Sequence, residues 1–409
     1  MAKLKAARAT DVVPPAMPEP DIAADLDGLA ASAASSCSCI RGTTCGAEAT
    51  TTTAEGRRPP LVVIGHRGKG MNALASPDPR LRGDVRENTL RAFNDAAASH
   101  PAVAYVEFDV QVTKDGCPVI FHDNFIYTQQ EGEISGKRVT DLDLDEFLSY
   151  GPQREQRKVG KPLLRKLKDG RILKWDVRSE DALCTLREVF QGVHRRVGFN
   201  VELKFDDDLV YTEERLTCIL QAVLKVVFEH ADDRPIIFSS FQPDAAQLIR
   251  KLQDKYPVFF LTNGGTQGYA DPRRNSLEEA VKLCVAGGLQ GIVSEVRAIL
   301  RQPSAVAKIK EANKLSLMTY GLLNNVPEVV YVQHLMGVDG VIVDLVREIA
   351  EAVSTFTVTA AVHESGSQDG GGIVVGERME MAAGAVAGTP SFSPREMSFL
   401  LRLIPELVQ

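Results

Sequence analysis

Three carboxylates near the ends of two apolar runs have the types and spacing to hold a metal ion. Glu107 and Asp109 lie two residues apart in the run Ala104–Val110, so in a strand both side chains point to one face. Glu202 stands near the end of a second run, Gly198–Leu203. Neighbouring strands that direct acids to one place are unfavourable unless a cation lies between them. Carboxylates without a thiolate or a His-x-x-x-His pair indicate a hard cation, Mg²⁺ or Ca²⁺, rather than Zn²⁺.

Two histidines follow apolar runs and are candidates for acid–base chemistry. His66 comes just after the run Leu61–Ile64, and His122 follows the short run Pro118–Phe121. Beside a cation, one imidazole can activate the attacking oxygen while the other protonates the leaving alkoxide. For His122 taken alone, a structural hydrogen-bonding role is the alternative.

Cationic side chains accompany these groups. Arg67 offers a planar fork and Lys204 a point charge, and either can stabilise the negative charge that develops on a phosphodiester. The tripeptide Glu87-Asn88-Thr89 opens a predicted helix whose first amides can face the same anion. A simple N-cap role for Asn88 or Thr89 is equally compatible with the pattern.

Eight aliphatic and β-branched runs supply strands that would position these residues. Helical patterns separate them, including Asp244–Gln253 after Pro243 and Ser276–Val285 with Ser276 as N-cap. Strands that alternate with helices in this number predict a (β/α)₈ TIM barrel, with an open doubly wound sheet as the alternative. In such a barrel the chemistry lies at the carboxyl ends of the strands. The runs are Leu61–Ile64, Ala104–Val110, Gly198–Leu203, Ile236–Ser239, Val258–Leu261, Gly291–Val296, Leu315–Tyr320 and Val338–Val343.

One connection of the predicted barrel is too long for an ordinary loop. The chain between His122 and Phe199 contains the basic stretch Arg165–Arg171 and a helix-like segment, Ala182–Phe190. We expect an insertion after the second strand that lies over the catalytic end of the barrel or acts as a lid. A solvated charged face explains the basic stretch at least as well as a binding role does.

The remaining segments are predicted to be tails around a barrel domain of residues 60–350. Residues 1–59 are small, polar and proline-containing, which predicts a disordered N-terminal tail, and residues 351–392 predict a flexible linker. Residues 393–409 combine a capping box with an apolar stripe, which predicts an amphipathic helix. That stripe most often packs on its own domain, and a homodimer contact is the alternative.

Composition narrows the class of protein. A formal net charge of −7 gives no reason to expect a nucleic acid partner. No apolar run approaches the roughly 20 residues of a membrane span, and the cysteines show neither a disulfide framework nor zinc spacing. The chain is therefore expected to be soluble and intracellular. The Ala-, Ser- and Thr-rich region 29–54 permits import into an organelle, whereas the acids between Asp11 and Asp27 favour the cytosol.

The ordered set of motifs resembles the glycerophosphodiester phosphodiesterase family, and its plant-like eukaryotic branch in particular. The resemblance covers residues 60 to about 350 and the closing stretch Ser398–Gln409. The motifs are His66-Arg67-Gly68, Glu87-Asn88-Thr89, Glu107-Phe108-Asp109, Phe121-His122-Asp123, Glu202-Leu203-Lys204, Ile237-Phe238-Ser239-Ser240-Phe241 and Met318-Thr319-Tyr320-Gly321.

The resemblance implies hydrolysis of glycerophosphodiesters, such as glycerophosphocholine, to sn-glycerol 3-phosphate and an alcohol. It implies Mg²⁺ as the cation, with Ca²⁺ as the alternative, and a plastid location, with the cytoplasm as the alternative. The implied roles are metal binding by Glu107, Asp109 and Glu202, acid–base catalysis by His66 and His122, and contacts to the phosphate or glycerol by Arg67, Glu87 and Lys204.

This chain departs from the family pattern in the substrate region. The loop Gly68–Glu87 and the segment after His122 are longer than in compact bacterial members, and the strand-seven aromatic residue is Tyr320, followed by Gly321. Two other functions remain as alternatives. One is a phospholipase-like lyase that acts on intact lipid, although the loop Gly68–Glu87 is poorly suited to membrane insertion. The other is a catalytically inactive scaffold on the same fold.

Overall fold

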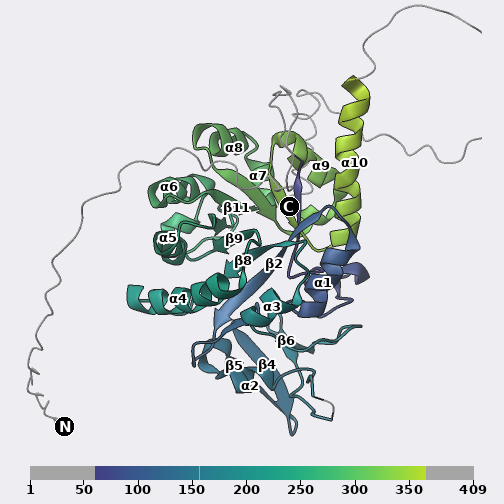
Figure 1. The fold of residues 1–409 in the computed structure, drawn as a ribbon, viewed down its shortest axis with the longest axis vertical. Helices are drawn as coiled ribbons and strands as arrows, with labels where there is room; N and C mark the ends of the chain where they lie inside the picture. Colours follow the sequence, from purple (N-terminus) through teal and green to yellow (C-terminus); the bar gives the residue numbers. More distant parts are fainter. Residues whose placement is uncertain (1–59, 156, 365–409) are drawn as a thin grey trace, which may run out of the picture. The chain divides into compact units, whose positions relative to one another are not determined.

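Eight parallel strands close into a barrel in the computed structural model, which describes residues 60–155 and 157–364 (Figure 1). Strand β1 pairs with β2 on one side and with β13 on the other, so the ring is complete. The predicted (β/α)₈ barrel is therefore confirmed, and the open sheet is excluded. In order around the barrel the strands are β1 (Val62–Gly65), β2 (Val103–Val112), β8 (Gly198–Leu203), β9 (Ile236–Ser240), β10 (Val258–Thr262), β11 (Gly291–Glu295), β12 (Ser316–Tyr320) and β13 (Gly340–Val343).

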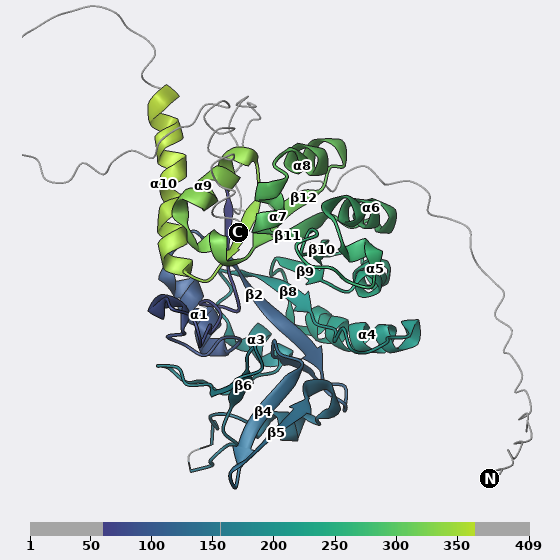
Figure 2. The same ribbon diagram turned by 180° about the vertical axis from the view of Figure 1, so that it is seen from behind.

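Helices connect these strands and cover the outside of the barrel, as Figures 1 and 2 show from opposite sides. They are α1 (Leu90–Ser99), α3 (Leu186–Gly192), α4 (Glu213–His230), α5 (Pro243–Leu252), α6 (Leu277–Gly287), α7 (Val296–Arg301), α8 (Ser304–Ala307), α9 (Pro327–Met336) and α10 (Val346–Glu364). Short 3-10 helices lie in loops: η1 (Pro79–Leu81), η2 (Val139–Asp141), η3 (Pro272–Arg274) and η5 (Leu322–Asn325). A π-helical turn, η4 (Lys308–Ala312), directly continues α8.

Side-chain caps fix where the helices begin. As predicted, the Ser276 hydroxyl accepts a hydrogen bond from the Glu279 amide, 3.0 Å away, at the start of α6. Helix α3 starts at Leu186, later than the predicted Ala182, because Thr185 and Glu188 form a capping box there.

The two faces of β2 have different functions. Phe108 points outward, and its ring centroid lies 5.1 Å from that of Phe199 and 5.3 Å from that of Phe93 in the core beneath the helices. Burial of such a ring contributes about 1.5–3 kcal/mol, so the outward face holds the strand in place. Glu107 and Asp109 alternate with it and point to the other face, as their spacing predicts.

The long connection after β2 is a folded insertion with its own sheet. Strand β3 (Pro118–Ile120) pairs antiparallel with β2. A second sheet in the order β5-β4-β6-β7, together with α2 (Leu144–Leu148), forms the lower group in Figure 1. Its strands are β4 (Phe125–Gln130), β5 (Glu133–Arg138), β6 (Leu164–Lys166) and β7 (Ile172–Lys174). The insertion has a separate hydrophobic core, formed by Val119, Phe121, Ile126, Val139, Leu142, Phe147, Tyr150, Leu163, Trp175 and Leu183.

The end of the barrel domain differs from the prediction. Helix α10 runs through Glu364, so the linker predicted from residue 351 does not begin there. The reason is that Val353 and Phe356 continue the buried face of the helix, whereas the glycine-rich stretch starts only after Glu364. The predicted tail 1–59, the predicted helix 393–409 and its dimer contact all lie outside the described residues.

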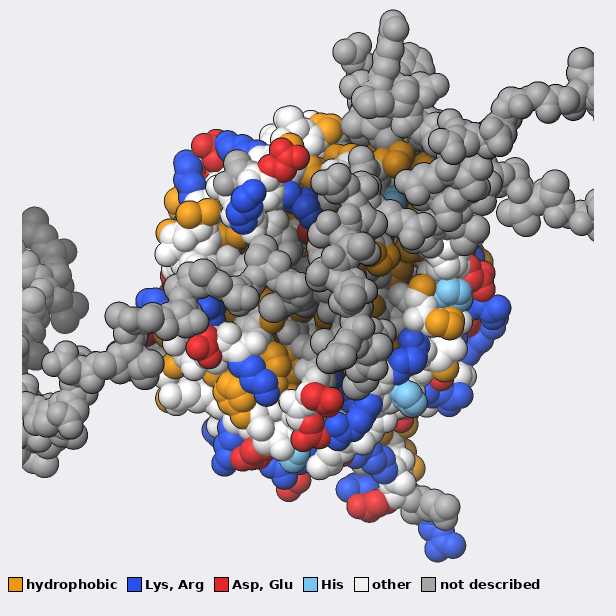
Figure 3. Space-filling model, turned by 45° about the horizontal axis from the view of Figure 1, so that its top comes forward, with side chains coloured by type: hydrophobic (Ala, Val, Ile, Leu, Met, Phe, Trp, Pro, Cys, Tyr) orange, Lys and Arg blue, Asp and Glu red, His pale blue; other side chains and the backbone are white. Residues whose placement is uncertain are grey.

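Charged side chains of both signs are interspersed on the described part of the face in Figure 3. Among the helices of residues 60–364, none combines the length and the apolar character that crossing a bilayer requires.

Candidate active site

Strand register brings the three predicted metal ligands together. Asp109 of β2 pairs with Glu202 of β8, and Glu107 precedes Asp109 by one full pleat. Carboxylate oxygens of the three residues lie within 4.8 Å of one another. At that distance two carboxylate charges repel each other by about 3–4 kcal/mol if the effective dielectric constant is near 20. The acidic cluster therefore requires compensating positive charge.

Titration of the acidic cluster reflects this crowding. Burial and the neighbouring Asp109 raise the pKa of Glu107 to about 8. For Asp109, burial acts in the same direction, but the nearby His122 and Lys204 outweigh it and lower the pKa to about 2. Burial also raises the pKa of Glu202. The cluster thus favours a neutral Glu107 unless further positive charge is supplied.

The cluster fits a hard divalent cation. Glu107 Oε1 is buried and has no hydrogen-bond partner among the described residues. The donor set consists of carboxylate oxygens alone, which suits Mg²⁺ or Ca²⁺ better than Zn²⁺. A divalent charge would also offset the repulsion that raises the pKa of Glu107.

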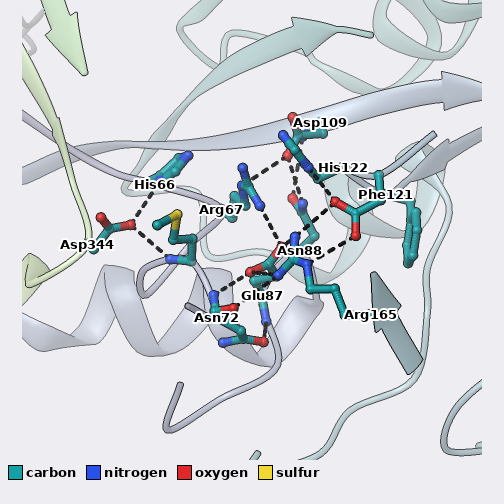
Figure 4. Close-up of polar contacts among 12 residues, drawn as sticks. His66, Arg67, Asn72, Glu87, Asn88, Asp109, Phe121, His122, Arg165 and Asp344 are labelled. Carbon is teal, nitrogen blue, oxygen red and sulfur yellow. Dashed lines mark hydrogen bonds and ion pairs between the residues drawn. The ribbon is translucent and has the colours of Figure 1, made fainter. Parts of the chain in front are cut away.

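His66 lies beside the acidic cluster because β1 is adjacent to both β2 and β13. Gly65 pairs with Val343, so the next residues, His66 and Asp344, meet across the two strands. His66 Nδ1 is 2.7 Å from Asp344 Oδ1 (Figure 4). The other ring nitrogen, Nε2, is 4.0 Å from Glu107 Oε2. The Asp344 contact therefore leaves Nε2 as the ring nitrogen that faces the acidic cluster.

Asp344 is itself fixed by hydrogen bonds. Its Oδ1 accepts one from the Met71 amide at 2.9 Å, and its Oδ2 accepts one from Asn325 Nδ2 at 3.0 Å. Burial alone would lower the pKa of His66, but the Asp344 carboxylate outweighs it, and the pKa lies above its ordinary value.

His122 reaches the site from the insertion. The Phe121 amide donates to the Asp109 carbonyl oxygen at 3.0 Å, which places the following residue beside the acidic cluster. His122 Nδ1 is 2.7 Å from Asp123 Oδ1. Burial and the positive charge of Arg67 lower the pKa of His122 to about 4. The pKa values of the two histidines are therefore shifted in opposite directions.

A strained turn places Arg67 between the barrel and α1. Arg67 has a left-handed backbone with φ of +49°, and its amide donates to Glu107 Oε2 at 2.8 Å. The next residue must be glycine: Gly68 has φ of +92°, and a Cβ there would lie 2.7 Å from the backbone of Ala92. The His-Arg-Gly motif is therefore a turn that positions two site residues in succession.

Arg67 and Lys204 are the cations nearest the acidic cluster. Arg67 Nε is buried, lies 3.6 Å from Asp109 Oδ2 and has no hydrogen-bond partner among the described residues. Lys204 Nζ donates to Glu202 Oε1 at 2.9 Å and lies 3.7 Å from Asp109 Oδ1. Both predicted phosphate-binding cations are thus at the site.

A cavity of about 460 Å³ opens beside His122, Glu202 and Lys204. Aromatic and charged residues from the insertion and from the loops after β8, β9 and β10 complete its lining, among them Phe125, Tyr127, Lys166, Asp207, Phe241, Tyr269 and Arg274. Tyr320 does not line this cavity; its ring packs edge-on against Phe241, with centroids 5.9 Å apart. Its hydroxyl bonds to the Asn263 side chain.

Glu87 is close to the site, but its carboxylate is occupied by protein donors. Its Oε1 accepts from Arg67 Nη1 at 2.7 Å and from Arg165 Nη2 at 3.0 Å. Its Oε2 accepts from Arg165 Nη1 at 3.0 Å and from the Asn72 amide. This geometry favours a role in orienting Arg67 over the direct substrate contact expected from the resemblance.

Asn88 and Thr89, which follow Glu87, have different roles. The Thr89 hydroxyl caps α1 by accepting from the Ala92 amide at 3.3 Å. Asn88 instead donates from Nδ2 to Asp109 Oδ2 at 2.8 Å. Thr89 is therefore the structural cap, and Asn88 orients a metal-ligand candidate.

Three residues hold the site together although their sequence context gave them no such role. Asp344 supports His66, Asp123 supports His122, and Arg165 bridges Asp123 and Glu87. Asp344 directly follows β13, so its place at a strand end was a usable signal. Asp123 adjoins His122, but Arg165 had no local signal, since its partners are 42 and 78 residues away.

Comparison with known proteins identifies the family of this chain. Residues 66–348 match the model of the "Glycerophosphoryl diester phosphodiesterase family". The chain is 54% identical over 357 residues to glycerophosphodiester phosphodiesterase GDPD2 of Arabidopsis thaliana, covering 86% of this chain and 91% of the relative. It is 55% identical over 353 residues to glycerophosphodiester phosphodiesterase GDPD1, chloroplastic, of the same plant, covering 85% and 91%.

A solved structure shares the fold. A phosphodiesterase of Oleispira antarctica, in complex with the product sn-glycerol-3-phosphate, aligns with a TM-score of 0.51 at 20% identity. The alignment covers 72% of this chain and 97% of the other. On the extent of the family match and the identity to the plant proteins, this chain belongs to the glycerophosphoryl diester phosphodiesterase family.

Proposed function

We propose that this chain hydrolyses glycerophosphodiesters, such as glycerophosphocholine, to sn-glycerol 3-phosphate and an alcohol. The observation that carries the proposal is that two histidines, each held at Nδ1 by a carboxylate, lie beside one buried acidic cluster. Hydrolysis of a phosphodiester needs a group that accepts a proton and one that donates it, beside a centre that stabilises anionic charge.

In this proposal, Glu107, Asp109 and Glu202 hold a divalent cation, Mg²⁺ in the first place and Ca²⁺ as the alternative. When bound, the cation would supply Lewis-acid stabilisation of the phosphoryl oxygens. Arg67 and Lys204 add positive charge towards the same oxygens.

The histidines exchange protons through their free ring nitrogens. Hydrogen bonds at Nδ1, to Asp344 for His66 and to Asp123 for His122, leave Nε2 of each ring for the substrate. The two carboxylates keep each ring in one orientation through the reaction.

A direct assay separates this function from its alternatives. Purified protein with Mg²⁺ is expected to release choline and sn-glycerol 3-phosphate from glycerophosphocholine, and to leave intact phosphatidylcholine vesicles unchanged. Choline release from vesicles alone would overturn the proposal in favour of a lipid-acting enzyme. Absence of product from both substrates, with either Mg²⁺ or Ca²⁺, would favour the inactive scaffold.

We further propose a plastid location, which the chloroplastic name of one Arabidopsis relative supports. Residues 1–59 fused to a fluorescent protein are expected to direct it into plastids, as seen by microscopy of plant cells. A matched fusion that lacks these residues is the control, and diffuse cytoplasmic fluorescence from both fusions would contradict the proposal.

A further inference from the structure

Arg165 enters the site from outside the barrel. It lies on β6 of the insertion, and only 11% of its side chain is exposed. A buried guanidinium needs hydrogen-bond acceptors, and those of Arg165 come from two separate parts of the chain. The acceptor in each part also bonds to a residue with a role in the proposed function.

The first contact leads to His122. Arg165 Nε donates to Asp123 Oδ2 at 3.1 Å, and its Nη2 donates to Oδ1 of the same carboxylate at 3.0 Å. That Oδ1 also bonds to His122 Nδ1 at 2.7 Å. The two-pronged contact fixes the plane of the Asp123 carboxylate, and the carboxylate in turn fixes the imidazole.

The second contact leads to Arg67. Arg165 Nη1 and Nη2 each lie 3.0 Å from a different oxygen of Glu87. The Glu87 carboxylate also accepts from Arg67 Nη1 at 2.7 Å (Figure 4). Arg165 therefore determines the position of a candidate phosphate-binding group as well as that of a candidate acid–base group.

The insertion holds the guanidinium in this orientation. The centre of the Arg165 guanidinium lies 4.3 Å from the ring centroid of Trp175, and Nη1 also donates to the Asn72 carbonyl oxygen at 3.2 Å. Trp175 Nε1 donates to Asn72 Oδ1 at 3.0 Å, so the ring itself cannot rotate freely. A lysine ammonium is a single point charge and cannot reproduce a planar contact to two carboxylates.

We propose that Arg165 is a positioning residue that acts on catalysis through Asp123 and Glu87, and that it couples the folding of the insertion to the alignment of the site. This inference rests on the proposed function. Among the described residues the polar contacts of Arg165 are with Asp123, Glu87 and the Asn72 carbonyl oxygen, and none is with the acidic cluster. Its effect on turnover must therefore pass through other residues. The insertion thus lines the cavity and also positions residues of the proposed active site.

The test compares kcat for glycerophosphocholine hydrolysis in Arg165→Met, Arg165→Lys and a control, Arg171→Met. Arg171 is exposed, and its side chain bonds to Asp169 on the β6–β7 turn. Its backbone carbonyl accepts a hydrogen bond from the Leu167 amide at 2.7 Å, which a side-chain replacement leaves in place. We expect Arg165→Met to lower kcat by about 10–100-fold, the usual scale for loss of a supporting contact. Arg165→Lys retains the charge that compensates the buried carboxylates, and is expected to fold and still lose about tenfold. The control should match wild type.

A double-variant comparison excludes a merely structural role. If Arg165 acts through His122, then Arg165→Met should cost at least about threefold less in a His122→Ala chain than in wild type. If Arg165→Met only reduced the fraction of folded protein, it would lower kcat by the same factor in the wild-type and in the His122→Ala background. An equal loss in the two backgrounds would therefore overturn the inference. Wild-type activity in Arg165→Lys would overturn it as well. Failure of the proposed function would be seen separately, as absence of product from the wild-type chain.

Discussion

Replacing His66 or His122 by alanine is expected to lower kcat by roughly 10²–10⁴-fold while the barrel stays folded. In the proposed mechanism each ring transfers a proton that no neighbouring group can transfer in its place, because Asp344 and Asp123 lie behind the rings at Nδ1. Steady-state hydrolysis of glycerophosphocholine measures the loss, and circular dichroism with thermal melting measures the fold.

The matched control is His194→Ala. His194 is exposed, and its Nδ1 accepts a hydrogen bond from the Arg196 amide at 3.1 Å. It therefore shares with His66 and His122 a hydrogen bond at Nδ1. This variant should keep wild-type turnover. Turnover within about threefold of wild type in either site variant would show that the acid–base pair is misassigned.

Chelation is expected to abolish hydrolysis, and readdition of Mg²⁺ or, less effectively, Ca²⁺ should restore it. Without a divalent cation, the carboxylates of the acidic cluster repel one another within 4.8 Å, and the pKa of Glu107 rises to about 8. The experiment treats the protein with EDTA, removes the chelator and measures activity against metal concentration. Unchanged activity after chelation would contradict the metal role.

Glu107→Ala should shift that metal titration to concentrations at least about 10–100-fold higher. Loss of a group that supports a metal ligand lowers metal affinity by about this factor, and loss of the ligand itself should lower it at least as much. The control is Glu278→Ala, an exposed carboxylate on α6 that pairs with Lys282. Equal metal dependence in both variants would place the cation elsewhere.

The clustering of the three carboxylates could be predicted because it follows from local geometry. The two-residue period of β2 puts Glu107 and Asp109 on one face, and the parallel register of β8 then places Glu202 beside them. His66 and Arg67 were found for the same reason, since carboxyl ends of barrel strands meet on one face.

What the sequence did not reveal depends on contacts between distant segments. Arg165 lies in a basic stretch that reads as a solvated face, yet in the structure it is buried between Asp123 and Glu87. Glu87 was assigned to substrate from resemblance, whereas its oxygens are taken up by Arg67 and Arg165. Only tertiary packing of the insertion decides both points.

The His66–Asp344 contact also has a consequence for how the chain becomes active during folding. Its two residues are 278 positions apart, and they meet only when the last strand docks on the first. Closing so long a loop is entropically costly and must be offset by the rest of the barrel. A nascent or partly refolded chain that has formed β1 to β12 therefore still lacks the carboxylate behind one catalytic imidazole. The carboxylate that fixes the His66 ring is thus in place only when the ring of strands is complete.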